Sequence, residues 1–169
     1  TPLRVCKNQR IHIHKVFKGI AQRGKCSMGW FFGFKLHLIC NEKGELLNFM
    51  ITPGDVDDRK PLEYKAFVDF IYGKQVGDKG YIGKNLFQRL FVDGIQLITK
   101  LKSNMKGALM SVSDRLLLRK RAIIETVNDE LKNIAQVEHS RHRCFDNFIA
   151  NLLGAVSYTH LTLPTNREV

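Results

Sequence analysis

Two acidic residues stand where a carboxylate could take part in chemistry. Asp78 follows the short stretch Gln75–Gly77 and precedes Lys79 and Gly80, so it is predicted to lie at the carboxyl end of a strand beside a glycine-rich turn. Glu125 lies within a long predicted helix. Carboxylates are natural ligands of Mg²⁺, and two such ions about 4 Å apart can activate the nucleophile and the leaving oxygen in phosphoryl transfer. These residues therefore admit metal-dependent phosphodiester chemistry.

Each of the two residues also has an ordinary structural explanation. An Asp before Lys-Gly, as at Asp78, is common turn chemistry. A Glu with Lys and Arg neighbours on a helix, as at Glu125, ordinarily belongs to a solvated face that forms salt bridges. Spacing alone leaves these explanations open beside the catalytic one.

The elements that must position these residues begin with a predicted hairpin. Residues 30–40 (WFFGFKLHLIC) place Phe32, Phe34, Leu36 and Leu38 on one parity and Lys35 and His37 on the other, which predicts a half-buried strand. Residues 45–52 (ELLNFMIT) return as a second strand after a turn that ends at Gly44.

Strands and helices alternate through the middle of the chain. A helix is expected over residues 57–72, followed by strand, sharp turn and helix over 75–91 and by a strand over 95–101. This order predicts an α/β fold with a mixed central sheet, an antiparallel hairpin followed by alternating helices and strands, flanked by helices.

Ser111 and Asp114 form an S-x-x-D capping signal for a long helix that extends to about Ala135. At 100° per residue, one side of this helix collects apolar residues: Leu117, Ile124, Val127, Leu131 and Ile134. The opposite side carries charged residues: Arg121, Glu125 and Lys132. One face is thus predicted to pack and the other to reach outward.

A last helix is predicted over Phe145–Val156, and the main domain is expected to cover residues 1–156. Residues 157–169 (SYTHLTLPTNREV) contain Thr, Pro and Asn and show no packing periodicity. They are similar to the translated tails that adapter read-through leaves on gene predictions, so we expect an unrelated, artefactual and poorly ordered tail.

Charge indicates the class of partner. The 169 residues carry a formal charge of +11 and a pI near 9.7, which favours nucleic acid, with a well-solvated basic surface as the alternative explanation. Several lysines and arginines are candidates for sequence-independent phosphate contacts: Lys7, Arg10, Lys15, Lys18, Lys100, Lys102 and Lys106.

The cysteines and the hydropathy bear on the compartment. The four cysteines form no CxxC pair, which fits neither a small disulfide scaffold nor a paired-cysteine zinc site. No apolar run approaches the roughly 20 residues of a membrane span, and the basic start has no apolar core of a signal peptide. A cytoplasmic protein is expected.

Two segments together resemble a known family. Residues 77–81 (GDKGY) and 121–126 (RAIIET) resemble the second and third acidic motifs of bacterial insertion-sequence DDE transposases, with residues 79–124 as a plausible separation. Arg121 and Lys132 match the basic members of the family's Y-R-E-K signature, whereas Leu118 fills its Tyr position. Residues 51–58 (ITPGDVDD) resemble the family's loop after the third strand, and the resemblance covers about residues 1–156.

The resemblance implies a ribonuclease-H-like fold with three antiparallel strands followed by alternating helices and strands. It implies a DNA transposase that carries out metal-dependent hydrolysis and strand transfer at insertion-sequence ends. Asp78 and Glu125 would be catalytic and would hold two Mg²⁺ ions, with Mn²⁺ as an alternative, while Arg121 and Lys132 would hold backbone phosphates. Transposon ends and target DNA are the implied partners, bound by a homo-oligomer.

One departure from the family concerns its first catalytic Asp, which belongs on the first strand. No acidic residue occurs between Thr1 and Asn41. We therefore expect that this Asp lies just before Thr1, and that the chain as printed neither binds the metal pair tightly nor cleaves DNA.

Two alternatives to a transposase stay open. A ribonuclease-H-like nuclease would have the same site but would not join the cut 3′ end to a target strand. A catalytically dead basic nucleic-acid-binding module would bind DNA equally well after Asp78→Asn or Glu125→Gln.

Overall fold

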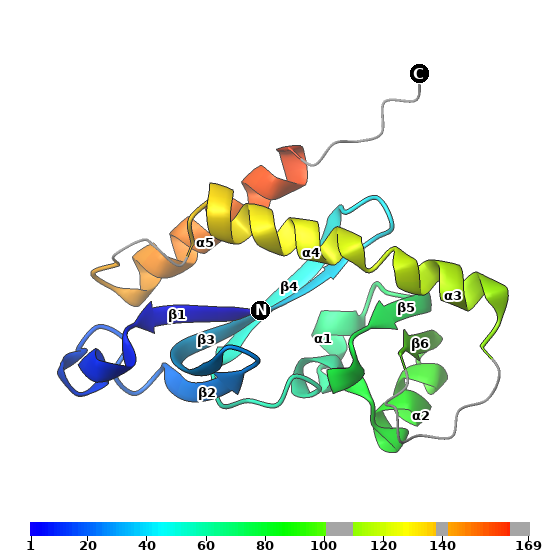
Figure 1. Ribbon diagram of the computed structural model, residues 1–169, viewed down its shortest axis with the longest axis horizontal. Coiled ribbons are helices and arrows are strands. Elements are labelled where there is room, and N and C mark those ends of the chain that lie inside the picture. The colour runs from blue at the N-terminus through cyan, green and yellow to red at the C-terminus, as the bar shows by residue number, and fades with distance from the viewer. Residues whose placement is uncertain (101–109, 138–141, 163–169) are drawn as a thin grey trace. The chain divides into compact units, whose positions relative to one another are not determined.

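The computed structural model describes residues 1–100, 110–137 and 142–162, with side chains through Tyr158 (Figure 1). It contains two compact units: unit 1 is Thr1–Val56 with Ile124–Val169, and unit 2 is Asp57–Ile123. Unit 1 has an antiparallel sheet with helices, and unit 2 has a parallel strand pair with helices, so the predicted α/β class is confirmed. The single mixed central sheet that the sequence predicted is wrong, because the described antiparallel and parallel strands form two separate sheets. The prediction of one domain over residues 1–156 stays a prediction.

The sheet of unit 1 is built around one long strand. Its members are β1 (Pro2–Cys6), β2 (Gln22–Cys26), β3 (Gly29–Cys40) and β4 (Leu46–Pro53). The other three strands all pair with β3 and are all antiparallel to it. The predicted hairpin of residues 30–40 and 45–52 is thus confirmed as β3 and β4.

The two edges of β3 are used differently. β1 pairs with Phe32–Lys35 on one edge, while β2 pairs with Gly29–Gly33 and β4 with Phe34–Cys40. Both β2 and β4 pair with residues of β3 that also pair with β1, so neither can lie on the same edge as β1. β2 and β4 must therefore share the other edge of β3, one after the other. The exchange of partners therefore falls at Gly33 and Phe34.

Glycines make this exchange possible. A Cβ atom on Gly33 would overlap the carbonyl oxygen of Leu3 in β1, and one on Gly24 would overlap the carbonyl oxygen of Gly54. The Gly54 N–H donates to the Gly33 carbonyl oxygen over 3.0 Å. Three strands and the loop after β4 thus approach one another at backbone distance, which only residues without side chains allow.

The prediction that β3 is half-buried is wrong, because β3 is buried on both parities. Phe32, Phe34 and Leu36 belong to the main core cluster, as predicted. On the other parity, Phe31, His37 and Ile39 are also buried. His37 tolerates this position because its Nε2 pairs with Thr52 Oγ1 over 2.9 Å, which satisfies both polar groups.

Helices cover the predicted apolar face of this sheet. The core cluster joins the strands to α4 (Ala122–Asp129), the π-helical segment η4 (Glu130–Ile134) and α5 (Phe145–Thr162) through Val127, Leu131 and Leu152. Phe17 and Phe34 each contact Phe148 of α5 as ring pairs. The 3₁₀ helix η1 (Asn8–Ile13) lies in the connection between β1 and β2.

The last helix extends further than its predicted end at Val156. α5 continues to Thr162, so the expectation that the helical pattern breaks at Ser157 is wrong. Residues 157–162 contain no Gly or Pro, and the chain meets its next helix-breaking residue only at Pro164. Residues 163–169 lie outside the described residues, and the foreign origin of the tail stays a prediction.

Unit 2 contains β5 (Gly73–Gly77) and β6 (Ile95–Thr99), paired in parallel, with α2 (Lys84–Val92) as the connection. The predicted strand, sharp turn and helix over 75–91 and the strand from Ile95 are confirmed. The last residue of the predicted strand 95–101, Leu101, is outside the described residues. The remaining elements are short: η2 (Lys60–Glu63), α1 (Lys65–Val68), η3 (Lys79–Tyr81) and α3 (Val112–Arg119).

The single helix predicted over 57–72 is wrong. Only η2 and α1 form, because Tyr64 between them adopts an extended backbone with φ −84° and ψ 116°. Phe67 is buried as the pattern requires, but Phe70 is 87% exposed. The apolar spacing therefore predicted more packed residues in this segment than the structure buries.

The long helix predicted over 111–135 is interrupted at Lys120 and Arg121, which form a turn between α3 and α4. Its start is confirmed, since Ser111 Oγ accepts from the Asp114 N–H over 3.1 Å. At its end, the Ala135 N–H donates to the Glu130 carbonyl oxygen in the i→i+5 pattern. This wider turn leaves Ile134 61% exposed, contrary to prediction, and buries Val137.

Across the parts of the chain that the structure describes, no helix combines the length and apolarity required to cross a bilayer.

Candidate active site

Asp78 lies where the sequence predicted, directly after β5. Gly77 and Thr99 are register partners, so the parallel strands β5 and β6 end together at this edge. Asp78 is the N-cap of η3, and the Lys79 N–H donates to Asp78 Oδ1 over 2.7 Å. A carboxylate at an N-cap is fixed in direction by this bond. The strand end and the cap together present Asp78 outward, with its side chain 64% exposed.

Helix α3 brings an arginine to this carboxylate. Lys74 Nζ of β5 pairs with Asp114 Oδ1 over 2.7 Å, which ties the start of α3 to the strand. This contact and the Ser111 hydroxyl lower the pKa of the Asp114 carboxyl below its usual value. Beyond the end of α3, Arg121 Nη1 donates to Asp78 Oδ1 over 2.8 Å. Within unit 2 the structure thus brings together two residues of the predicted site, Asp78 and Arg121.

Tyr81 is a residue of this site that the sequence reasoning missed. Its ring packs against the end of β5, since a Cβ atom on Gly77 would stand 3.4 Å from Tyr81 Cδ2 and 3.6 Å from Thr99 Cγ2. Burial, followed by the charges of Asp58 and Asp78, raises the pKa of the Tyr81 phenol to about 12. The phenol therefore stays neutral beside the carboxylates. The GDKGY motif contained a signal that could have predicted this contact, since Gly77 at the end of a strand has no side chain and leaves room for the ring of Tyr81.

We expect the Tyr81 phenol to make unit 2 less stable at alkaline pH. Below pH 10 the phenol is protonated in both the folded and the unfolded chain. Between the ordinary pKa of 10.0 and the raised pKa of about 12, the phenol ionises in the unfolded chain but stays protonated in the folded one. The free energy of unfolding should therefore fall through this pH window, by up to about 3 kcal/mol. Urea unfolding at pH values across it should show this loss, and Tyr81→Phe should remove it. Tyr72→Phe, at a residue 87% exposed, should leave the loss intact, and an equal effect would contradict the assignment.

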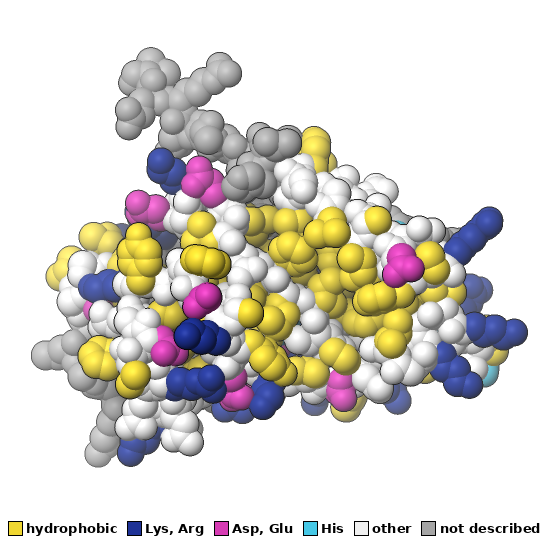
Figure 2. Space-filling model, turned by 180° about the vertical axis from the view of Figure 1, so that it is seen from behind, with side chains coloured by type: hydrophobic (Ala, Val, Ile, Leu, Met, Phe, Trp, Pro, Cys, Tyr) yellow, Lys and Arg dark blue, Asp and Glu magenta, His cyan; other side chains and the backbone are white. Residues whose placement is uncertain are grey.

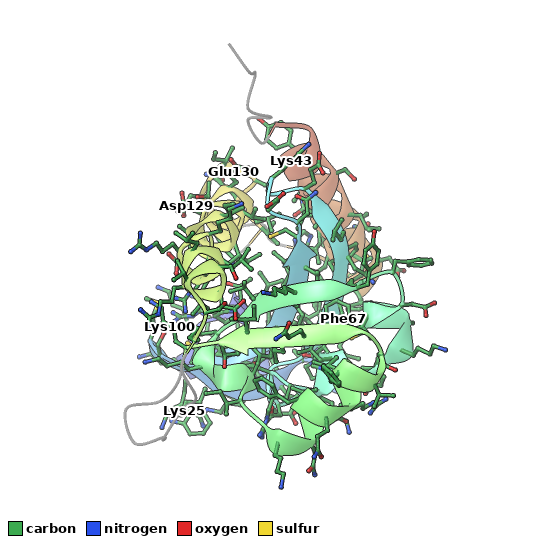
Figure 3. All side chains as sticks on the ribbon, turned by 90° about the vertical axis from the view of Figure 1, so that its right-hand side faces the viewer. Lys25, Lys43, Phe67, Lys100, Asp129 and Glu130 are labelled. Atoms are coloured by element: carbon green, nitrogen blue, oxygen red, sulfur yellow. The ribbon has the colours of Figure 1, made fainter. Side chains whose placement is uncertain are left out.

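The remaining predicted residues are spread over both units. Lys100, labelled in Figure 3, is exposed and directly follows β6, while Lys102 and Lys106 are outside the described residues. Glu125 is exposed on α4, and Lys132 lies half-buried in η4. Glu125 and Lys132 belong to unit 1, on the side of the helix that the pattern predicted to face away from the core.

The donor chemistry of Asp78 fits a hard divalent cation. Among the residues that the structure describes, no group of three or more His, Cys, Asp or Glu side chains gathers as a metal cage. A single accessible carboxylate is nevertheless what Mg²⁺ uses when it keeps several of its waters. Among the described residues, the contacts of the Asp78 carboxylate with Lys79 and Arg121 are both made by Oδ1, and the group is well exposed, so a hydrated cation can reach it.

Comparison with protein families agrees with this arrangement. Residues 1–145 match the family described as transposase DDE domain, which is more than half of the chain. The chain belongs to the transposase DDE-domain family. Membership implies DNA binding and transposase chemistry, and it confirms the resemblance drawn from the acidic motifs. No curated protein and no solved structure matched this transposase domain.

Proposed function

We propose that this transposase domain carries out divalent-metal-dependent hydrolysis and strand transfer at the ends of a bacterial insertion sequence. The observation that carries the proposal is the placement of Asp78 at the carboxyl end of paired parallel strands, in contact with Arg121, in a chain of the DDE family. Catalytic groups of α/β sheets occur at this edge. The proposed setting is the cytoplasm, with transposon ends and target DNA as partners.

Asp78 and Glu125 are the proposed ligands of two Mg²⁺ ions, or of Mn²⁺ in their place. When bound, such ions activate the attacking water or hydroxyl and stabilise the leaving oxygen. The N-cap bond from Lys79 fixes the direction of the Asp78 carboxylate, and the neutral Tyr81 phenol packs on the strand end behind it. Asp58, whose charge also acts on Tyr81, is a further acidic residue near this edge.

Arg121 and Lys132 are the proposed phosphate contacts. A guanidinium has five N–H donors, so the contact of Arg121 Nη1 with Asp78 leaves capacity for a phosphate beside the same carboxylate. This arrangement would place the scissile phosphate next to a proposed metal ligand. Lys100, exposed after β6, would add affinity that depends on salt and not on base sequence.

We also propose a ribonuclease-H-like fold and a homo-oligomer on DNA. The order of elements supports the fold, because an antiparallel hairpin is followed by alternating helices and parallel strands. The oligomer follows from the reaction, since transposition requires that two ends be held together.

The test uses the whole protein, including any residues that its gene encodes ahead of Thr1. A labelled DNA end should be nicked and then joined to a target strand only when Mg²⁺ or Mn²⁺ is present. Glu125→Gln should lower both steps at least about hundredfold, because an amide is a poor replacement for an anionic metal ligand. Glu42→Gln, an exposed acid in the β3–β4 turn of the same unit, should change neither step.

Two other results would replace the proposal. Nicking without joining would identify a nuclease of the same fold. Tight DNA binding with no metal-dependent reaction, unchanged by Glu125→Gln, would identify a nucleic-acid-binding module.

A further inference from the structure

The amino-terminal part of unit 1 forms a surface of one charge sign. The first acidic residue of the chain is Glu42, so every charged side chain before it is basic or His. The arginines and lysines of the first 30 residues are all exposed: Arg4, Lys7, Arg10, Lys15, Lys18, Arg23 and Lys25. Figure 2 shows Lys and Arg side chains along the right-hand edge of its view, where unit 1 carries η1 (Figure 1).

A tryptophan stands within this basic surface. Trp30 is 52% exposed at the start of β3, whereas tryptophan is highly buried on average. The register pairs Trp30 with Lys25 of β2, and Arg23 lies two residues further along on the same face of the sheet. Arg23 Cζ lies 5.4 Å from the ring centroid and Lys25 Nζ lies 5.9 Å from it. Figure 3 shows Lys25 projecting away from the strands.

Two features hold the backbone under this group. Cys26 and Gly29 are register partners, so β2 and β3 are joined by the two-residue turn Ser27–Met28. The Asn8 side-chain amide of η1 donates to the Trp30 carbonyl oxygen over 2.9 Å. The hairpin and this bond hold the backbone from which the indole projects, which limits the conformational freedom to be lost on binding.

We propose that Arg23, Lys25 and Trp30, here called the Trp30 platform, contact DNA by stacking the indole on an unpaired base. Arg23 and Lys25 neutralise the phosphates on either side of that base. A flat aromatic surface among cations matches the way proteins hold single strands, where bases stack on rings and the groove follows the backbone. An acidic peptide would need the cations but would leave the exposed indole without a planar partner. The inference rests on the proposed function, since it assumes a DNA substrate.

The chain offers a direct readout, because Trp30 is its one tryptophan. A duplex with a short single-stranded tail is titrated into the protein while the tryptophan emission is followed. Stacking on a base should quench this emission in step with binding. Inorganic polyphosphate, which offers charge without bases, should bind the surface and leave the emission unchanged.

Variants separate stacking from charge. Trp30→Ala should weaken binding of the tailed duplex about tenfold, and Trp30→Phe should restore most of that affinity. Arg23→Ala with Lys25→Ala should lower the salt dependence by about one counterion for each residue. Tyr72→Ala removes an aromatic that is 87% exposed in unit 2 and should change nothing. Far-ultraviolet circular dichroism confirms that each variant is folded.

The outcomes distinguish this inference from the proposed function. DNA binding that leaves the Trp30 emission unchanged and survives Trp30→Ala overturns the Trp30 platform while the transposase proposal stands. Quenching by polyphosphate equal to that by DNA also overturns it, since the signal would then report charge alone. Failure to bind any DNA at low salt overturns both.

Discussion

Asp78→Asn is expected to lower metal-dependent DNA nicking and joining at least about hundredfold in the whole protein. The amide keeps the N-cap bond from the Lys79 N–H, because Asn and Asp cap helices equally well, so η3 should fold normally. What the substitution removes is the negative charge that a cation requires and that Arg121 contacts. Single-turnover cleavage of a labelled end measures the effect.

The matched control for Asp78→Asn is Asp93→Asn. Asp93 is an exposed carboxylate in the same unit, at the end of α2, and its substitution should leave activity within about twofold. Binding of Mn²⁺, followed by calorimetry, gives a second readout that does not depend on turnover. If Asp78→Asn cleaves DNA and binds Mn²⁺ as well as the unaltered protein, Asp78 serves only the turn.

Gly33→Ala is expected to produce the largest loss of stability. The new methyl group would overlap the Leu3 carbonyl oxygen. Gly33 lies in the central strand β3 and Leu3 in its partner β1, so neither backbone can move away without breaking their pairing. Overlap of this kind costs about 3 kcal/mol or more. For a chain of this size the midpoint of thermal unfolding should drop by about 10 °C.

Gly154→Ala is the same chemical change as Gly33→Ala, but it is expected to increase stability. Gly154 lies in α5 and has no atom within 4 Å of an added Cβ, so alanine should stabilise the helix by up to about 1 kcal/mol. Urea unfolding of the two variants should therefore shift in opposite directions. Equal shifts would show that the strand exchange at Gly33 tolerates a side chain.

The features that the sequence predicted are those that local pattern decides. Alternation and a turn glycine define the β3–β4 hairpin, Ser111 caps α3 through its own neighbours, and Asp78 ends a strand because glycines follow. These signals act over a few residues and do not depend on what packs nearby. The acidic motif that led to the family belongs to this class.

The features that the sequence did not predict depend on contacts between distant residues. His37 is polar by type but is buried because Thr52 of the neighbouring strand satisfies it. Tyr81 joins the site because its ring fills the space over Gly77, and Trp30 became notable only when its exposure and its two cations were known. Apolar residues do recur at helical spacing over residues 57–72, but the extended backbone at Tyr64 separates this segment into two short helices.

The π-helical segment η4 has a consequence for how this chain aligns with other transposases. A turn closed by an i→i+5 bond holds one residue more than an α-helical turn, and one residue corresponds to a rotation of about 100°. A relative that lacks one residue between Leu131 and Val137 would continue as a regular helix. Its counterpart of Ile134 would then be turned by about 100° from the exposed direction that Ile134 has here. An insertion or deletion at this point would thus change which side chains face the core beyond it, while Glu125, one turn and more upstream, would keep its direction.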